Sequence, residues 1–218
     1  MAIKLAVLDM AGTTVNDLVN GVPLVLKSYK DAFERYGVDV PYEVLNEQRG
    51  RDKYTVISEL GGNKADEIYE HFHLKLLDNI QNVKEIKGVS DTLNELKTRE
   101  IRIVASTGFP QDVARAIVDH LNWIELGLID YWISSETVGV SRPDPAMILW
   151  SMRHFGIGEP SQVIKVDDTV KGIEEGKNAG VHTVAVLTGT QSIQRLSKSN
   201  PDTIIKSITE LPDYIDKI

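Results

Sequence analysis

Two patterns of apolar residues alternate along most of the chain. Short apolar runs predict buried strands, and apolar residues that recur every three or four positions predict amphipathic helices. The strands are expected at 3–8, 101–105, 131–134, 163–166, 183–187 and 203–205, and the helices at 89–98, 110–121, 143–155, 170–179, near 193 and at 211–218. Strands that alternate with helices indicate an α/β fold, with a parallel sheet covered on both faces.

The segment after the first strand has a different pattern. Residues ~17–84 show the helical spacing and no strand pattern, beginning with Val22, Leu26 and Tyr29. Helices are expected at 22–36, 41–48, 52–60 and 68–80. We therefore predict a core domain from residues 1–16 and 87–218, and an inserted all-helical cap domain from residues 17–86. Hinges are expected near Asp17 and Ile86, and the cap should cover the carboxyl edge of the sheet.

Composition narrows the class of protein. The chain has 218 residues, 42% of them hydrophobic, which suffices for one large core with a small second domain. A net charge of −8 argues against general nucleic-acid or anionic-membrane binding. There is no cysteine and no apolar run near the ~18 residues of a membrane span. The strand begins almost at the first residue, with no signal-peptide pattern, so we expect a cytoplasmic protein.

Polar loops follow three of the predicted strands, at 9–14, 106–108 and 167–169. The carboxyl ends of parallel strands share one edge, where α/β sheets bind ligands. Asp9 and Asp168 are candidate ligands for Mg²⁺, which prefers one or two carboxylates with waters and phosphate oxygens. The structural alternatives are a simple turn at Asp9 and helix capping by Asp167 or Asp168.

The string from Asp9 to Thr14, D-M-A-G-T-T, resembles the first motif of the haloacid dehalogenase superfamily. In that superfamily the Asp attacks phosphorus and becomes an aspartyl phosphate, on a Rossmann-like three-layer core. Most of its phosphatases carry a second Asp two residues on, where this chain has Ala11. The resemblance is to the phosphonatase branch, the phosphonoacetaldehyde hydrolases. It implies a metal bound by Asp9, Asp168 and the backbone carbonyl of Ala11.

The other loops resemble the remaining motifs of the superfamily. Thr107 and Gly108 match the second motif, which binds the phosphoryl group together with Gly12 and Thr13 of the first. Arg142, in S-R-P-D-P, matches the third motif, where phosphonatases use Arg and most relatives use Lys. The fourth motif aligns Asp168 with the metal ligand. Asp167 replaces a commoner Gly and is a further possible ligand, whereas Gly172 stands where many relatives have another acid.

The cap contains the string Arg49-Gly50-Arg51-Asp52-Lys53. In phosphonatases a lysine at the position of Lys53 forms a Schiff base with an aldehyde substrate. The resulting iminium accepts the electrons of the C–P bond, and it requires a neutral amine. Nearby cations such as Arg49 and Arg51 would favour the neutral amine by lowering its pKa.

Three positions depart from the phosphonatase pattern. Val56 stands where a His assists proton transfer, and Phe109 replaces a Tyr. Arg49 replaces a Met, and in a helical loop it would share a face with Lys53. A second cation there suggests a substrate with an extra anionic group, such as a carboxylate.

These observations predict a Mg²⁺-dependent phosphonatase-like hydrolase that acts on a small phosphonate or phosphorylated substrate. A phosphate monoester phosphatase is the alternative, although Ala11 removes its usual general acid. A phosphometabolite-binding protein with low turnover is a third possibility. The resemblance also implies a homodimer through the cap.

Overall fold

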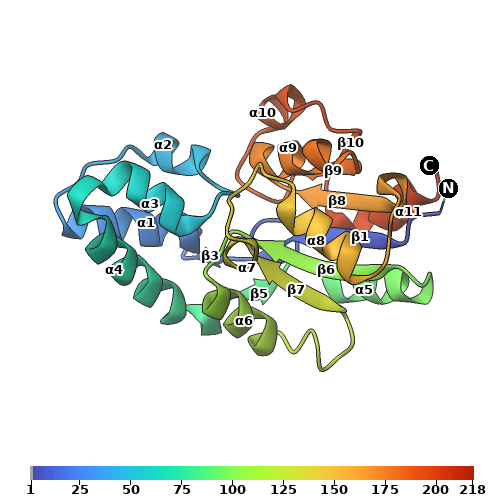
Figure 1. The fold of residues 1–218 in the computed structure, drawn as a ribbon. Coiled ribbons are helices and arrows are strands. Elements are labelled where there is room, and N and C mark those ends of the chain that lie inside the picture. The colour runs from blue at the N-terminus through green and yellow to red at the C-terminus, as the bar shows by residue number, and fades with distance from the viewer. Residues whose placement is uncertain (1) are drawn as a thin grey trace.

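The structure, a computed structural model, describes residues 2–218. Its centre is a six-stranded parallel sheet in the order β10-β9-β8-β1-β6-β7 (Figure 1). The strands are β1 (Leu5–Asp9), β6 (Arg102–Thr107), β7 (Tyr131–Ser134), β8 (Val163–Asp167), β9 (His182–Val186) and β10 (Thr203–Ile205). All six predicted strands are therefore confirmed, and the first of them lies at the centre of the sheet.

Helices cover both faces of this sheet, as the α/β pattern predicts. Alternate residues of β1 belong to different core clusters: Ala6 and Leu8 to one, Leu5 and Val7 to the other. Such alternation follows from the two-residue period of a strand. The covering helices are α5 (Val89–Thr98), α6 (Gln111–His120), α7 (Ser135–Val138), α8 (Ala146–His154), α9 (Val170–Ala179), α10 (Ile193–Lys198) and α11 (Leu211–Ile215).

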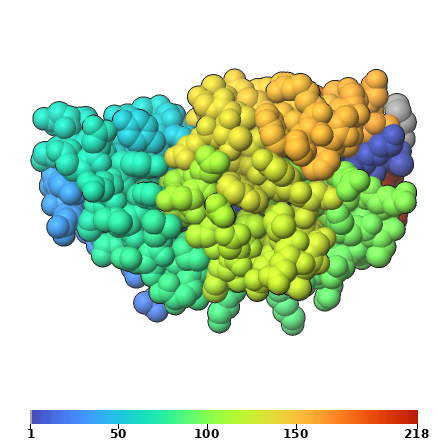
Figure 2. All heavy atoms as spheres, turned by 60° about the horizontal axis from the view of Figure 1, so that its bottom comes forward, coloured from blue at the N-terminus to red at the C-terminus, as the bar shows by residue number. Residues whose placement is uncertain are grey.

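A helical insert follows β1 and lies beyond the carboxyl edge of the sheet, where the arrowheads of β6 and β8 point (Figure 1). Its helices pack through aromatic residues, including Tyr29 and Phe72, whose stacked rings lie 4.5 Å apart. On the face in Figure 2 the insert lies directly against core atoms. The helices are α1 (Leu24–Arg35), α2 (Tyr42–Glu47), α3 (Lys53–Gly61) and α4 (Ala65–Leu77).

The prediction that this segment has no strands is wrong. A hairpin with a two-residue turn pairs β3 (Leu18–Val19) with β4 (Val22–Pro23). Because of this hairpin, α1 begins at Leu24 rather than at residue 22. Asn20 and Gly21 form its turn with φ of 54° and 78°, the left-handed conformation that such turns require. Where the chain enters and leaves the insert, β2 (Val15–Asn16) pairs with β5 (Lys84–Glu85).

None of the helices within residues 2–218 combines the length and apolar character that crossing a membrane requires.

Candidate active site

Asp9 ends β1 at the middle of the sheet edge. The strand is buried along its whole length, and Asp9 lies opposite Ser106 of β6. Thr14 Oγ1 donates a 2.7 Å hydrogen bond to the backbone oxygen of Asp9, which fixes the turn that follows. Arg142 Nη1 donates a 2.6 Å hydrogen bond to Asp9 Oδ1. The predicted convergence at one edge is confirmed, because Val166 of β8 also lies opposite Leu8.

Three buried carboxylates gather at this edge. Asp9, Asp167 and Asp168 each contribute an oxygen, and these oxygens lie within 4.8 Å of one another. Burial and the charge of Asp167 raise the pKa of Asp9, against the opposing effect of Arg142 and Lys165. Burial also raises the pKa of Asp168 well above its usual value, and with the charges of Asp9 and Asp167 it outweighs the lowering effect of Arg49. Like charges this close together require a cation, so the group could hold a metal ion.

Asp168 has the free oxygen that a metal ligand needs. Its Oδ1 accepts a 3.3 Å hydrogen bond from Thr13 Oγ1, but Oδ2 accepts none from residues 2–218. The ion-pair partner of Oδ2, Arg49 Nη2, is 3.7 Å away and also donates a 3.0 Å hydrogen bond to the Ala11 carbonyl. Gly12 packs directly against this carboxylate. A buried carboxylate oxygen beside a backbone carbonyl fits a hard cation such as Mg²⁺.

Asp167 is in a different environment from its neighbour. Its Oδ1 accepts hydrogen bonds from Thr169 N at 2.9 Å and Thr169 Oγ1 at 2.7 Å. Its Oδ2 pairs with Lys165 Nζ at 3.1 Å and Arg142 Nη1 at 3.3 Å. Although burial acts in the opposite direction, Lys165 and Arg142 lower the pKa of Asp167. Neither aspartate caps α9, because that role belongs to Thr169, whose side chain accepts from Gly172 N.

Arg142 is held by charged residues that the sequence analysis did not identify. Its Nε pairs with Glu175 Oε2 at 2.8 Å, and its Nη2 donates to Ser106 Oγ at 2.9 Å. Lys165 Nζ donates to the same Ser106 oxygen at 2.8 Å and pairs with Glu175 at 3.3 Å. A lysine inside the apolar strand V-I-K-V-D was the available signal, because a buried charge requires a partner.

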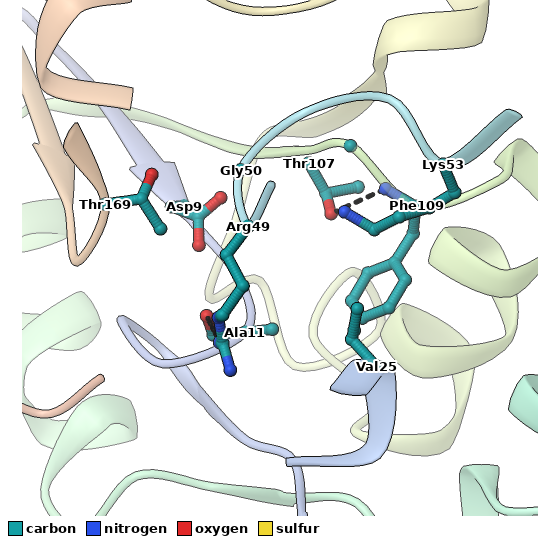
Figure 3. Close-up of a pocket in the computed structure, with 10 residues that line it drawn as sticks. Asp9, Ala11, Val25, Arg49, Gly50, Lys53, Thr107, Phe109 and Thr169 are labelled. Atoms are coloured by element: carbon teal, nitrogen blue, oxygen red, sulfur yellow. Dashed lines mark hydrogen bonds between the residues drawn. The ribbon is translucent and has the colours of Figure 1, made fainter. Parts of the chain in front are cut away.

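The insert contributes Lys53 to the same site. Its side chain is buried, Nζ donates a 2.7 Å hydrogen bond to the Arg51 carbonyl, and Nζ lies 5.6 Å from the centre of the Phe109 ring. Figure 3 shows Lys53 and Phe109 on one side of a cavity and Asp9 on the other. Burial lowers the pKa of Lys53 to about 8, against the raising effect of Asp52 and Asp9.

The loop before Lys53 is anchored to the core. Asp52 caps α3 by accepting from Thr55 N at 2.7 Å, and its other oxygen accepts from Ser135 Oγ at 2.9 Å. Its backbone N–H donates to Ser141 Oγ at 2.8 Å. One aspartate thus starts the helix that carries Lys53 and links the insert to α7 and to the loop that follows α7.

Arg49 lies in this loop rather than on a helix, so the condition under which it would share a helical face with Lys53 is not met. Both side chains nevertheless line the cavity. Arg49 is 3% exposed, and its Nη1 makes no hydrogen bond within the described chain. Arg51 points away and pairs with Glu59 at 2.6 Å. Of these two arginines, Arg49 is the one that contributes to the lowered pKa of Lys53.

Thr107 and Gly108 line the cavity from the core side. Thr107 Oγ1 accepts a 3.1 Å hydrogen bond from Phe109 N (Figure 3). A side chain at position 108 would collide with the Arg51 carbonyl, so glycine allows the loop of the insert to approach the core backbone.

The structure brings six of the predicted site residues to one cavity. Five predicted site residues are not among the lining residues, although Gly12 and Thr13 contact Asp168. They are Gly12, Thr13, Arg142, Asp167 and Asp168. Val56 is fully buried and offers no acid or base. The lining residues are Asp9, Ala11, Val25, Arg49, Gly50, Lys53, Thr107, Gly108, Phe109 and Thr169.

Comparisons with known proteins agree with this geometry. Residues 7–186 match the family of haloacid dehalogenase-like hydrolases. The chain is 32% identical to a phosphonoacetaldehyde hydrolase of Bordetella pertussis, covering 83% of this chain and 71% of that protein. A phosphonoacetaldehyde hydrolase of Lactiplantibacillus plantarum is 24% identical, with 100% and 97% covered.

Among solved structures, a phosphonoacetaldehyde hydrolase-like protein from Oleispira antarctica superposes with a TM-score of 0.86 at 21% identity, covering 100% of this chain and 92% of that one. A hydrolase from Pseudomonas syringae gives a TM-score of 0.85 at 15% identity, with 99% of each chain covered. At these identities the superpositions show the shared fold, a parallel sheet with a helical insert. The family match, the buried acidic group and the fold lead to one conclusion: this chain belongs to the haloacid dehalogenase-like hydrolases and is related to the phosphonoacetaldehyde hydrolases.

Proposed function

We propose that this protein is a Mg²⁺-dependent hydrolase of the C–P bond in a carbonyl phosphonate. Asp9 is the nucleophile that attacks phosphorus, and Lys53 activates the carbonyl group as an imine. One observation carries the proposal: a buried lysine with a pKa of about 8 lines the same cavity as Asp9. An ordinary surface lysine is almost entirely protonated at neutral pH and is therefore a poor nucleophile.

Lys53 supplies the electron sink that C–P cleavage requires. The neutral amine adds to the carbonyl carbon and water leaves, which gives an imine that becomes an iminium on protonation. As the C–P bond breaks, its electron pair moves into the iminium and forms an enamine. Protonation of the enamine carbon and hydrolysis of the imine then release the carbonyl product and restore the amine.

Asp9 accepts the phosphoryl group. Its carboxylate oxygen forms a bond to phosphorus as the C–P bond breaks, and water later cleaves the aspartyl phosphate to release phosphate. Arg142, hydrogen-bonded to Asp9, balances charge on the nucleophile and on the phosphoryl oxygens. Asp9, Asp168 and the Ala11 carbonyl would hold Mg²⁺, which would supply charge neutralisation at the phosphoryl group.

The insert, residues 17–86, acts as a cap over the site. The paired strands β2 and β5 form its hinge region. Opening there admits the substrate, and closing brings Lys53 to Asp9 and excludes water. Contacts between the Arg49–Lys53 loop and the core, such as Asp52 with Ser135, support this role.

Arg49 binds a further anionic group of the substrate. Its guanidinium is buried beside Lys53, and Nη1 has no hydrogen-bond partner within residues 2–218. A carboxylate is the group that suits a free guanidinium N–H. The substrate class is therefore a phosphonate that carries both a carbonyl and a carboxylate.

Phosphate ester hydrolysis is the second candidate, favoured by the buried Val56. Because residue 56 is a valine, it provides no acid or base for the proton transfers of imine chemistry. Water or the substrate must then carry out those transfers. Ala11 argues against this candidate, because an alkoxide leaving group needs a general acid.

A turnover panel tests the proposal. Purified protein with Mg²⁺ is assayed for phosphate release from phosphonoacetaldehyde, carboxylated carbonyl phosphonates and phosphate monoesters. We expect the carbonyl phosphonates to be hydrolysed fastest. Preference for esters would establish a phosphatase, and binding without turnover on any compound would establish a phosphometabolite-binding protein.

A further inference from the structure

Two neighbouring aspartates at the end of β8 have opposite surroundings. Oδ2 of each aspartate is buried and makes no hydrogen bond within residues 2–218, but their cationic partners differ. Asp167 Oδ2 pairs with Lys165 at 3.1 Å and Arg142 at 3.3 Å, whereas the partner of Asp168 Oδ2, Arg49, is 3.7 Å away. A metal ligand needs a lone pair that no close cation occupies, and Asp168 Oδ2 is the oxygen with fewer and more distant cationic partners.

We propose that Asp167 positions Arg142 and Lys165 and leaves metal binding to Asp168, and that its carboxylate occupies the space of an absent side chain at position 172. This proposal deepens the proposed function, because Arg142 acts on the phosphoryl group there.

The charges at the site support this division. Arg142 and Lys165 contact Asp167 and Glu175 through four ion pairs of 2.8 to 3.3 Å. These two cations and two carboxylates form a neutral, fully buried group, which we call the buried frame. Asp9 and Asp168 lie outside it, with Arg142 and Arg49 as their respective cationic partners, and their two carboxylates are the ones that would face a divalent cation.

The frame controls the direction of the Arg142 guanidinium. Glu175 holds Nε, Asp167 lies near Nη1, and Ser106 accepts from Nη2. Nη1 remains directed at Asp9, to which it donates its 2.6 Å hydrogen bond. Without Asp167, Arg142 and Lys165 would carry an excess buried positive charge, and Nη1 would lose one of the groups that hold it in place.

Gly172, in the first turn of α9, explains how the frame fits into the fold. A Cβ placed on Gly172 would overlap the carboxylate of Asp167, meeting its Cγ and both oxygens. The carboxylate therefore occupies the space that the side chain of any other residue at 172 would enter. An aspartate at 172, combined with glycine at 167, would extend its carboxyl group from this same point toward Lys165 and Arg142.

Two sets of variants test the proposal. Asp167→Asn and Asp168→Asn are matched, nearly isosteric changes at adjacent positions, compared by calorimetric Mn²⁺ affinity and by thermal unfolding with chelator. We expect Asp168→Asn to lose Mn²⁺ affinity by at least tenfold without a fall in unfolding temperature. Asp167→Asn should keep its Mn²⁺ affinity within about threefold and unfold at a lower temperature.

The second set of variants transfers the carboxylate from position 167 to position 172. Asp167→Gly and Gly172→Asp should each lower the unfolding temperature, the first by leaving the cations unpaired and the second by steric overlap. The double variant should be more stable than both and should recover turnover relative to Asp167→Gly. This comparison tests the positioning role of Asp167 even if Asp167→Asn fails to fold.

Equal loss of Mn²⁺ affinity in Asp167→Asn and Asp168→Asn would overturn the proposal. A double variant no more stable than either single variant would overturn it as well. Both readouts are independent of substrate, so they remain decisive if the turnover panel rejects C–P hydrolysis.

Discussion

The core and the insert handle buried charge in opposite ways. In the core, Arg142 and Lys165 each pair with two or more carboxylates at 3.3 Å or less. In the insert, Lys53 has a backbone carbonyl and an aromatic ring as its close partners, and burial lowers its pKa to about 8. Paired cations stay charged and fixed in place, whereas an unpaired buried lysine readily becomes neutral. The core is therefore suited to phosphoryl charge, and the insert to carbonyl chemistry.

The largest effect is expected from the core. Asp9→Asn keeps the shape of the side chain and removes the nucleophile, so turnover should fall by at least about 100-fold on every substrate. Steady-state phosphate release measures this, with circular dichroism to verify folding. Retention of more than about one hundredth of the wild-type rate would exclude covalent catalysis by Asp9.

Removal of the metal should also stop the reaction. Asp9, Asp168 and a phosphoryl dianion cannot occupy one crevice without a compensating cation. Chelator should abolish phosphate release, and added Mg²⁺ should restore it. Full activity after exhaustive chelation, verified by metal analysis, would contradict the metal assignment.

The insert should impose a pH dependence that the core does not. A neutral Lys53 amine is the reactive form, and its fraction increases as the pH rises through about 8. The imine-dependent rate should therefore rise roughly tenfold from pH 7 to a plateau above pH 9. Stopped-flow rates on carbonyl phosphonates across this range measure the rise. A plateau reached below pH 7 would mean that some other group controls the reaction.

A smaller effect is expected at Arg49. Arg49→Met removes one charge-assisted hydrogen bond, worth ~1.5 kcal/mol, and should narrow the preference for carboxylated phosphonates about tenfold. Competition between carboxylated and simple carbonyl phosphonates measures that preference. Arg51→Met is the matched control, because Arg51 belongs to the same loop but pairs with Glu59 outside the cavity. If both variants leave the preference unchanged, Arg49 does not contact the substrate.

Much of the fold could be predicted because it depends on local patterns. In a parallel sheet the carboxyl ends of all strands lie at one edge. The loop that begins at Asp9 and the two later strand-end loops must therefore meet there, independently of side-chain packing. The short hairpin at Asn20 and Gly21 was missed, although an Asn-Gly pair between apolar residues is a strong turn signal. Two-residue strands are too short to show an alternating pattern.

The arrangement of charges could not be predicted from the sequence. Asp167 and Asp168 are adjacent, and only the resemblance to the fourth motif favours Asp168 as the metal ligand, because the residues themselves do not distinguish the two. Their difference depends on the directions of Lys165 on the same strand, Glu175 on α9 and Arg49 in the insert, which the fold determines. A lysine within an apolar strand indicates a buried partner but does not identify it.

Borohydride trapping is the most direct test of imine formation by Lys53. The protein is incubated with a carbonyl phosphonate and borohydride, and peptides are mapped by mass spectrometry. We expect irreversible inactivation and a reduced adduct on Lys53 alone. Lys53→Arg should resist labelling and lose C–P cleavage, because arginine cannot supply a neutral amine near pH 7. The exposed Lys64→Arg is the control and should behave as wild type. Absence of an adduct, together with normal ester hydrolysis by Lys53→Arg, would contradict imine chemistry and leave Asp9 as the nucleophile of a phosphatase.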